Sequence, residues 1–215
     1  MFWLFLKVKW FLFREENQVR RDFPSFARFE HAFKRAYRFQ NPFHLCRNFL
    51  KQRGEKEPDA YGETPIPIFA RIAKECCLHP DDLLFEVGCG RGRGAIFLSH
   101  LCGCQVIGID WVPAFIRTAN DIAAKVDPSL KAFFRCADMH SVDYSDATLI
   151  YLYGTCLSDA QVLSMIGQFE KTRTGTKIIT VSFPLTDYSS RFRVVNQFTG
   201  RFPWGEGEVF VQIKN

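Results

Sequence analysis

Residues 86–94 read Glu86-Val87-Gly88-Cys89-Gly90-Arg91-Gly92-Arg93-Gly94. This stretch follows an apolar run at 83–87 that is typical of a buried strand, and a helical pattern opens directly after it. Gly88 and Gly90 let the backbone turn sharply and let a ligand approach more closely than a side chain would permit. The stretch therefore predicts a strand, a ligand-binding glycine loop and a helix, in that order.

A second apolar run, at 105–109, ends beside an acid, Asp110, which lies 20 residues after Gly90. In nucleotide-binding units of this kind, an acid at that distance hydrogen-bonds the ribose hydroxyls of an adenosine. The loop, its strand and the spaced acid together predict a site for an adenosine-containing ligand. The alternative, a tight turn that binds nothing, leaves the matching acid unexplained.

Two side chains of the loop indicate which adenosine ligand it binds. A dinucleotide site would carry a third glycine at position 93, and Arg93 stands there instead. Glu86 places a carboxylate close to the loop, which suits a cationic ammonium group better than a pyrophosphate because like charges repel. The chain after Gly90 is needed for the sheet itself and is too short for a dehydrogenase. These residues favour S-adenosylmethionine over a dinucleotide.

Strand and helix patterns alternate from residue 61 onward. The runs typical of buried strands are 83–87, 105–109, 131–135, 147–153 and 177–183. Helical stretches separate them at 65–78, 94–103, 113–126 and 158–171. Two further strand-like runs, 191–198 and 207–213, have no helix between them. The pattern predicts an α/β fold with a doubly wound, mostly parallel sheet that ends in an antiparallel C-terminal hairpin.

The acid-x-Gly-x-Gly loop at 86–90, followed by Asp110, resembles the class I S-adenosylmethionine-dependent methyltransferases over residues 61–215. The resemblance implies a Rossmann-like seven-stranded sheet and S-adenosylmethionine as cofactor, with S-adenosylhomocysteine as its product. Glu86 and the Gly88–Gly90 turn would hold the methionine part, and Asp110 the ribose. Trp111 would lie beside the adenine, and Asp138 at its amino group. The cofactor-binding residues expected in this way are Tyr61, Thr64, Glu86, Gly88, Cys89, Gly90, Asp110, Trp111, Asp138 and Met139.

Two shorter similarities indicate which methyltransferases within this class the chain resembles. Residues 61–65, Tyr-Gly-Glu-Thr-Pro, resemble the loop that closes over the donor in non-SET protein-lysine methyltransferases. Residues 181–184 and the strand at 208–213 resemble the tail of a small mitochondrial and bacterial group of lysine methyltransferases. Mitochondrial members of that group modify the ATP/ADP carrier and a subunit of ATP synthase, and they begin with a hydrophobic, membrane-associating segment. The resemblance implies a protein lysine as the methyl acceptor.

The residues after the fourth strand are candidates for the acceptor site. Methyl transfer is an in-line displacement, so the protein must align the acceptor, and a lysine acceptor must first lose its proton. We predict that Tyr153 and Thr155 line the acceptor channel, with Glu63 and Tyr61 opposite. The predicted catalytic residues are therefore Glu63, Tyr153 and Thr155. In the plainer alternative, Tyr153 packs on the sheet and Thr155 caps a helix, although Ser158 is the better cap.

The sequence leaves three hypotheses for function. The leading hypothesis is a methyltransferase (EC 2.1.1.-) that modifies a protein lysine. The alternatives are a methyltransferase for a small molecule, lipid or quinone, and a non-catalytic adaptor that binds S-adenosylmethionine. Many enzymes that methylate nucleobase amines carry Asn/Asp-Pro-Pro-aromatic after the fourth strand, and Tyr153-Gly154-Thr155-Cys156 stands here instead. A nucleic-acid acceptor is therefore less expected than a protein.

The N-terminal part differs from the rest in charge and hydrophobicity. Residues 1–60 hold 13 Lys and Arg against 7 Asp and Glu, which suits an anionic membrane, an acidic protein, nucleic acid or a solvated surface. Residues 1–13 are too short for a spanning helix of about 20 residues. Trp3 and Trp10 beside two lysines favour peripheral contact with lipid headgroups, and the alternative is packing on the protein's own core.

We expect three parts in the chain. Residues 1–13 form the apolar, basic N-terminal segment, residues 14–60 a helical extension, and residues 61–215 the methyltransferase domain. In the extension, Phe26, Phe29 and Phe33 recur at helical spacing, which predicts packing rather than a platform for nucleotide stacking.

The eight cysteines lie mostly in apolar or glycine-rich stretches, which is typical of buried free thiols. They form no Cys-x-x-Cys pair, and the five histidines show no ligand spacing, so we expect no metal. Free thiols favour an intracellular, cytoplasmic location, with the peripheral membrane contact described above. The sequence leaves the oligomeric state open.

Overall fold

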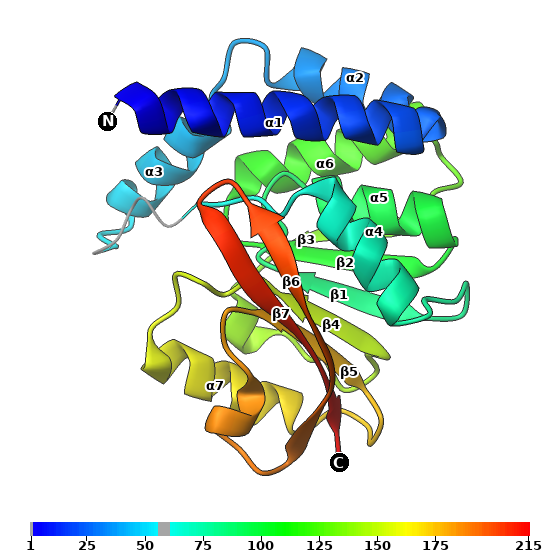
Figure 1. Ribbon diagram of the computed structural model, residues 1–215, viewed down its shortest axis with the longest axis vertical. Coiled ribbons are helices and arrows are strands. Elements are labelled where there is room, and N and C mark those ends of the chain that lie inside the picture. Colours follow the sequence, from blue (N-terminus) through cyan, green and yellow to red (C-terminus); the bar gives the residue numbers. More distant parts are fainter. Residues whose placement is uncertain (1, 56–60) are drawn as a thin grey trace.

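The computed structural model describes residues 2–55 and 61–215 (Figure 1). The predicted boundary between residues 14–60 and 61–215 falls at residues 56–60, which lie outside the described part, as does Met1 of the N-terminal segment.

The centre of the molecule is one seven-stranded sheet, in which every strand expected from the sequence is present. Its strands are β1 (Leu83–Val87), β2 (Gln105–Asp110), β3 (Ala132–Cys136), β4 (Leu149–Leu152), β5 (Lys177–Val181), β6 (Phe192–Phe202) and β7 (Gly205–Lys214). Their order across the sheet is β3-β2-β1-β4-β5-β7-β6. The first five strands pair in parallel, and β7 pairs antiparallel with both β5 and β6. The predicted Rossmann-like fold and its C-terminal hairpin are confirmed.

Helices cover both faces of the sheet, which explains why its central strands are apolar on both sides. These helices are α4 (Ile66–Glu75), α5 (Arg93–Cys102), α6 (Pro113–Val126) and α7 (Asp159–Phe169). Along β1, Leu84 faces the core shared with α4, α5 and α6, whereas Phe85 and Val87 face the core shared with α7. This alternation follows from the two-residue period of a strand.

The first two N-terminal helices share the core of α4, α5 and α6, whereas the third packs in a smaller cluster with Val112 and Phe115. They are α1 (Phe2–Asp22), α2 (Ala27–Ala36) and α3 (Pro42–Gln52), with a short 3-10 turn, Pro24–Phe26, before α2. Phe26 and Phe29 are fully buried, and the ring of Phe26 lies 5.1 Å from that of Phe97 in α5. The aromatic stripe is therefore a packing surface, as its spacing predicted. In Figure 1, α1 lies across the end of the molecule above α4, α5 and α6.

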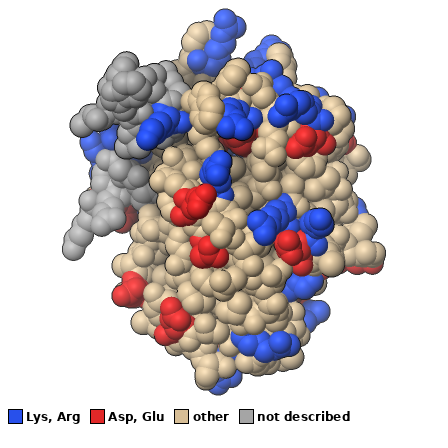
Figure 2. All heavy atoms as spheres, in the orientation of Figure 1, with Lys and Arg blue, Asp and Glu red and all other residues tan. Residues whose placement is uncertain are grey.

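Helix α1 runs without a break through the predicted division at residue 13. In the described part of the chain, no helix is both long and apolar enough to cross a membrane. Trp10 and Phe13 on α1 are about three-fifths exposed, at 61% and 62%. Figure 2 shows Lys and Arg side chains along the upper part of this face, over α1 and α2.

Two sequence expectations need correction. The hairpin strand β6 extends past residue 198 because 199–202 pair with 205–208 of β7 across a tight turn. The sequence predicted mostly buried thiols, but the burial of the cysteines is mixed. Buried thiols are those of Cys46, Cys76, Cys89 and Cys104, and exposed ones are those of Cys77, Cys136 and Cys156. The exposed thiols follow strand or helix ends, where an apolar neighbourhood in sequence does not imply burial.

Gly92 offers a test of how strictly this fold requires the glycine loop. It has a φ of 77°, and a Cβ added there would lie 2.4 Å from the ring of Phe134. We expect Gly92→Ala to lower the free energy of unfolding by roughly 2–4 kcal/mol, because backbone strain and overlap add. The matched control is Gly167→Ala in α7, where no atom lies within 4 Å. This change should raise stability by about 0.5–1 kcal/mol, since alanine is the better helix former.

Urea unfolding followed by circular dichroism would measure both variants. Equal unfolding midpoints for the two would contradict the assigned loop geometry.

Candidate active site

The site lies where the carboxyl ends of β1 and β2 meet the amino end of α5, the position at which open parallel sheets bind ligands. The loop between β1 and α5 carries the glycines, and Gly92 caps the helix in a left-handed conformation. The amides of Gly88 and Cys89 both donate to the Ile109 carbonyl at 2.9 Å. The glycine loop is thereby attached to the end of the neighbouring strand.

Asp110 connects the same two segments through its side chain. The Gly90 amide donates to Asp110 Oδ2, and the Val112 amide to Oδ1, each at 2.8 Å. Burial raises the pKa of Asp110 to about 6, against the opposing effect of these amides. A carboxylate has about four lone-pair sites, so both oxygens keep capacity for a ribose diol. The geometry places the two most specific sequence signals in direct contact.

Glu86 is a buried carboxyl at the base of the site, with 5% of its surface exposed. Its Oε2 has no hydrogen-bond partner among the described residues. Burial raises the pKa of Glu86 to about 8, while an amide hydrogen bond from Ala95 opposes this rise. A Cβ on Gly94 would lie 2.5 Å from Glu86 Oε1, so glycine is required there. An unpartnered buried carboxyl is costly unless a positive ligand group reaches it.

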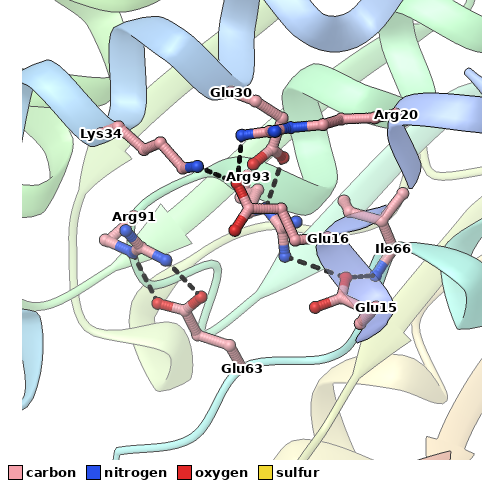
Figure 3. Close-up of polar contacts among 9 residues, drawn as sticks. All are labelled: Glu15, Glu16, Arg20, Glu30, Lys34, Glu63, Ile66, Arg91 and Arg93. Carbon is pink, nitrogen blue, oxygen red and sulfur yellow. Dashed lines mark hydrogen bonds and ion pairs between the residues drawn. The ribbon is translucent and has the colours of Figure 1, made fainter. Parts of the chain in front are cut away.

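Residues 61–65, named here the covering loop, lie directly over the glycine loop. A Cβ on Gly90 would be 3.0 Å from the ring of Tyr61. The Tyr61 hydroxyl donates to Glu63 Oε1 at 2.5 Å, and Arg91 binds both Glu63 oxygens at 2.6 Å (Figure 3). Burial acts to raise the pKa of Glu63, but the Arg91 guanidinium outweighs it and holds that pKa below its usual value. Glu63 is therefore a carboxylate that fastens the covering loop to the glycine loop.

Two tyrosines of the fourth strand complete the wall. The Thr64 hydroxyl and the Tyr151 hydroxyl are 2.5 Å apart, and a Cβ on Gly62 would lie 3.1 Å from the Tyr153 ring. Together with the covering loop, these side chains enclose a small pocket. Its lining is Gly62, Glu63, Thr64, Phe69, Glu86, Gly88, Cys89, Arg91, Arg93, Gly94, Tyr151 and Tyr153.

Tyr153 lies between this pocket and the C-terminal hairpin. Trp204 Nε1 donates to the Tyr153 hydroxyl at 2.6 Å, and the Tyr153 ring stacks on Phe202 with 5.6 Å between centroids. Burial raises the pKa of Tyr153, whereas hydrogen bonds with Trp204 and Thr155 lower it. Thr155 itself is exposed. Ser158, with Gln161, forms the capping box of α7, so Thr155 does not cap that helix.

The predicted adenine side is more open. Trp111 is half-buried, and the Arg53 guanidinium of the α3 C-terminus lies 4.2 Å from its ring centroid. Asp138 and Met139 follow β3, and Asp138 Oδ1 accepts from the His140 amide at 2.9 Å. Asp138 therefore caps its own turn in this structure, and its predicted contact with an adenine stays a prediction.

Sequence reasoning missed the two loop arginines as functional residues. Arg91 binds the covering loop, and Arg93 binds Glu15 of α1 and Glu30 of α2 (Figure 3). Their alternation with Gly90, Gly92 and Gly94 was the available signal. The carboxylates that pair with them lie 28 to 78 residues away in the chain, so no local pattern links them.

The residues of the site fit S-adenosylmethionine. Its ammonium matches the unpartnered Glu86 oxygen, and its ribose matches the carboxylate at the end of β2. The described residues contain no group of three or more His, Cys, Asp or Glu that could hold a metal ion.

Comparisons with known proteins agree with this geometry. Residues 84–170 match a family model described as a methyltransferase domain. A histone-lysine N-methyltransferase from Dictyostelium discoideum, specific for H3 lysine 79, is 22% identical over 180 residues, or 77% of this chain. The 27-O-demethylrifamycin SV methyltransferase of Amycolatopsis mediterranei is 33% identical over 78 residues, or 36% of the chain. The matches span 9% and 29% of these two relatives, respectively.

The fold recurs in solved structures. An RNA methyltransferase from Salinibacter ruber in complex with S-adenosyl-L-homocysteine superposes with a TM-score of 0.59. It covers 71% of this chain and 93% of its own length, at 22% identity. Residues 84–170 are therefore similar to a methyltransferase domain, and the sheet that contains them has the Rossmann-like methyltransferase fold.

Proposed function

We propose that this protein transfers a methyl group from S-adenosylmethionine to a protein side chain, with lysine as the acceptor. The observation that carries the proposal is the covering loop, which Arg91 fastens over the glycine loop through Glu63. A loop closed in this way keeps water away from the donor site, as transfer to a side-chain amine requires. The 22% identity to a histone-lysine methyltransferase over most of the chain supports a protein acceptor.

The bound cofactor would supply a methyl group already activated on a sulfonium. The chain's own residues then hold and align the reactants, which contributes about 7–11 kcal/mol when the reacting atoms lie in line at about 3–3.5 Å. Glu86 would bind the ammonium and Asp110 the ribose hydroxyls. Tyr153 would line the acceptor channel, and burial keeps its pKa high, so its phenol stays neutral and can accept a hydrogen bond from the incoming amine.

The roles of the three predicted catalytic residues differ in this arrangement. Glu63 is paired with Arg91, so we propose that it closes the site rather than accepting the lysine proton. Tyr153 lines the pocket, whereas Thr155 is exposed and interacts with the Tyr153 side chain through a hydrogen bond. Desolvation lowers the pKa of the lysine as its amine enters, so the amine can pass its proton to water at the mouth of the site.

Labelling would test the proposal. Purified protein, radiolabelled S-adenosylmethionine and separated membrane and soluble cell fractions should yield a labelled protein band, and its hydrolysate should contain methyl-lysine. Asp110→Ala should reduce the label at least about tenfold, because it removes the predicted ribose contact and the support of Gly90. Asp121→Ala, on the exposed face of α6, is the matched control and should leave it unchanged.

Other outcomes favour the alternatives. Label in extracted lipid or small molecules alone would support the runner-up, which the short match to the rifamycin enzyme also favours. Binding of S-adenosylhomocysteine without transfer to any fraction would support the adaptor.

The raised pKa of Glu86 leads us to expect that donor binding depends on pH. Because burial raises its pKa to about 8, Glu86 is protonated in the free protein at pH 7. An ammonium group favours the carboxylate, so binding S-adenosylhomocysteine should release up to about one proton. Titration calorimetry in buffers of different ionisation enthalpy measures this number. Glu86→Gln should abolish the release and weaken binding, while Glu206→Gln, an exposed control in β7, should change neither.

The Glu86 carboxyl also makes the stability of the fold depend on pH. The pKa of Glu86 is raised on folding, so its stabilising contribution is complete below about pH 4.5 and is lost as the pH rises through about 8. Glu86→Gln should flatten this decline in thermal unfolding. Equal proton release by the wild type and the variant would contradict the assignment.

We also propose that α1 makes peripheral contact with anionic membranes. Trp10 and Phe13 are largely exposed, and basic side chains lie over α1 and α2 (Figure 2). Replacing Trp10 and Phe13 with alanine should lower partitioning of the protein onto vesicles of phosphatidylcholine and phosphatidylglycerol at least about tenfold. The reason is that each large apolar side chain contributes about 1.5–3 kcal/mol when it is buried. Leu163→Ala, an exposed apolar residue on α7, is the control. Equal pelleting of all three proteins would refute this contact.

A further inference from the structure

Arg93 is the first residue of α5, directly after the glycine loop, and its side chain is 14% exposed. Its Nε donates to Glu30 at 2.7 Å, and one terminal nitrogen donates to Glu15 at 3.2 Å. Glu15 belongs to α1 and Glu30 to α2, so both partners come from the N-terminal helices (Figure 3). A guanidinium has five donors in a fixed fork, which lets it bind a further anion while these contacts persist.

Glu15 has a second contact, with the start of α4. The same oxygen that meets Arg93 accepts from the Ile66 amide at 3.0 Å, and Pro65 provides no side-chain cap for this helix. Glu15 therefore joins three segments: the N-terminal helix, the end of the covering loop and the residue after the glycine loop. Its burial, at 7% exposure, makes the contact specific rather than a solvated surface pair.

Two carboxyl groups and two guanidinium groups line the pocket beneath the covering loop. Glu86 presents an unpartnered oxygen, and Arg93 lines the same pocket beside it. The amino-acid end of the donor carries one ammonium and one carboxylate, so it matches this pair. Arg91 also lines the pocket, where its guanidinium binds the two oxygens of Glu63 in the covering loop. The amino end of α5 adds partial positive charge where Arg93 lies.

We propose that Glu15 and Glu30 are positioning residues of the donor site, which hold Arg93 so that its guanidinium binds the carboxylate of the donor. The helices α1 and α2 thereby set the affinity for the amino-acid end of the donor and leave the adenosine end unaffected. The inference rests on the proposed function, since it takes S-adenosylmethionine as the donor.

Two ligands, each tested with the full chain, distinguish binding of the amino-acid end of the donor from binding of its adenosine end. S-adenosylhomocysteine carries the amino-acid group, and 5′-methylthioadenosine lacks it. We expect Glu15→Gln and Glu30→Gln each to lower the affinity for S-adenosylhomocysteine about tenfold. The affinity for 5′-methylthioadenosine should change less than twofold, and titration calorimetry measures both affinities. Arg93→Gln should lower the affinity for S-adenosylhomocysteine more strongly. Arg93→Lys keeps the charge and should recover part of this lost affinity. Glu16→Gln is the matched control, because the neighbouring Glu16 contacts Lys34 and Arg20 instead.

The outcomes are distinguishable. Equal losses of affinity for both ligands, or no loss for either, would overturn the positioning role of Glu15 and Glu30. If Glu15→Gln unfolds, Glu30→Gln gives the same ligand comparison, because it leaves the contacts of Glu15 with Arg93 and with the Ile66 amide in place. Failure of the wild type to bind either ligand would instead refute the proposed function.

Discussion

The hydrogen bond from the Gly90 amide to the Asp110 carboxylate is the contact on which the site depends. It joins the loop after β1 to the end of β2, and the Ile109 carbonyl supports the same connection through two further amides. Because Asp110 is buried, an amide partner stabilises its ionised form, and the loop gains a fixed position in return. Every other part of the site is placed relative to this loop: the covering loop through Arg91, and the N-terminal helices through Arg93.

The arrangement explains why arginine and glycine alternate in this loop. The glycines permit left-handed backbone and leave space for Tyr61, Phe134 and the Glu86 carboxyl. The arginines extend away from the loop and reach carboxylates on other segments. Buried pairs of this kind contribute less to stability than their number indicates, because each charge loses its hydration. Their value here is geometric, since they determine where the segments around the pocket lie.

The sequence predicted the mostly parallel sheet and its antiparallel C-terminal hairpin well, because these depend on local patterns. A strand with two buried faces, a glycine loop and an acid at a fixed spacing are all visible within about 30 residues. The sequence could not predict that Glu15 and Glu30 meet Arg93, or that Trp204 meets Tyr153, since those pairs are brought together by the fold. It also missed the continuous α1, because the change from apolar to charged residues near residue 13 marks a change of surface and not a helix end.

The position of β7 has a consequence for how the protein forms on the ribosome. Strand β7 lies between β5 and β6 although it follows both in the chain, so β5 keeps an open edge until β7 has been synthesised. The turn that precedes β7 carries Trp204, which holds Tyr153 at the pocket. A nascent chain can therefore pair strands β1 to β5 first, and it gains the contact between Trp204 and Tyr153 only when the C-terminal hairpin has been synthesised.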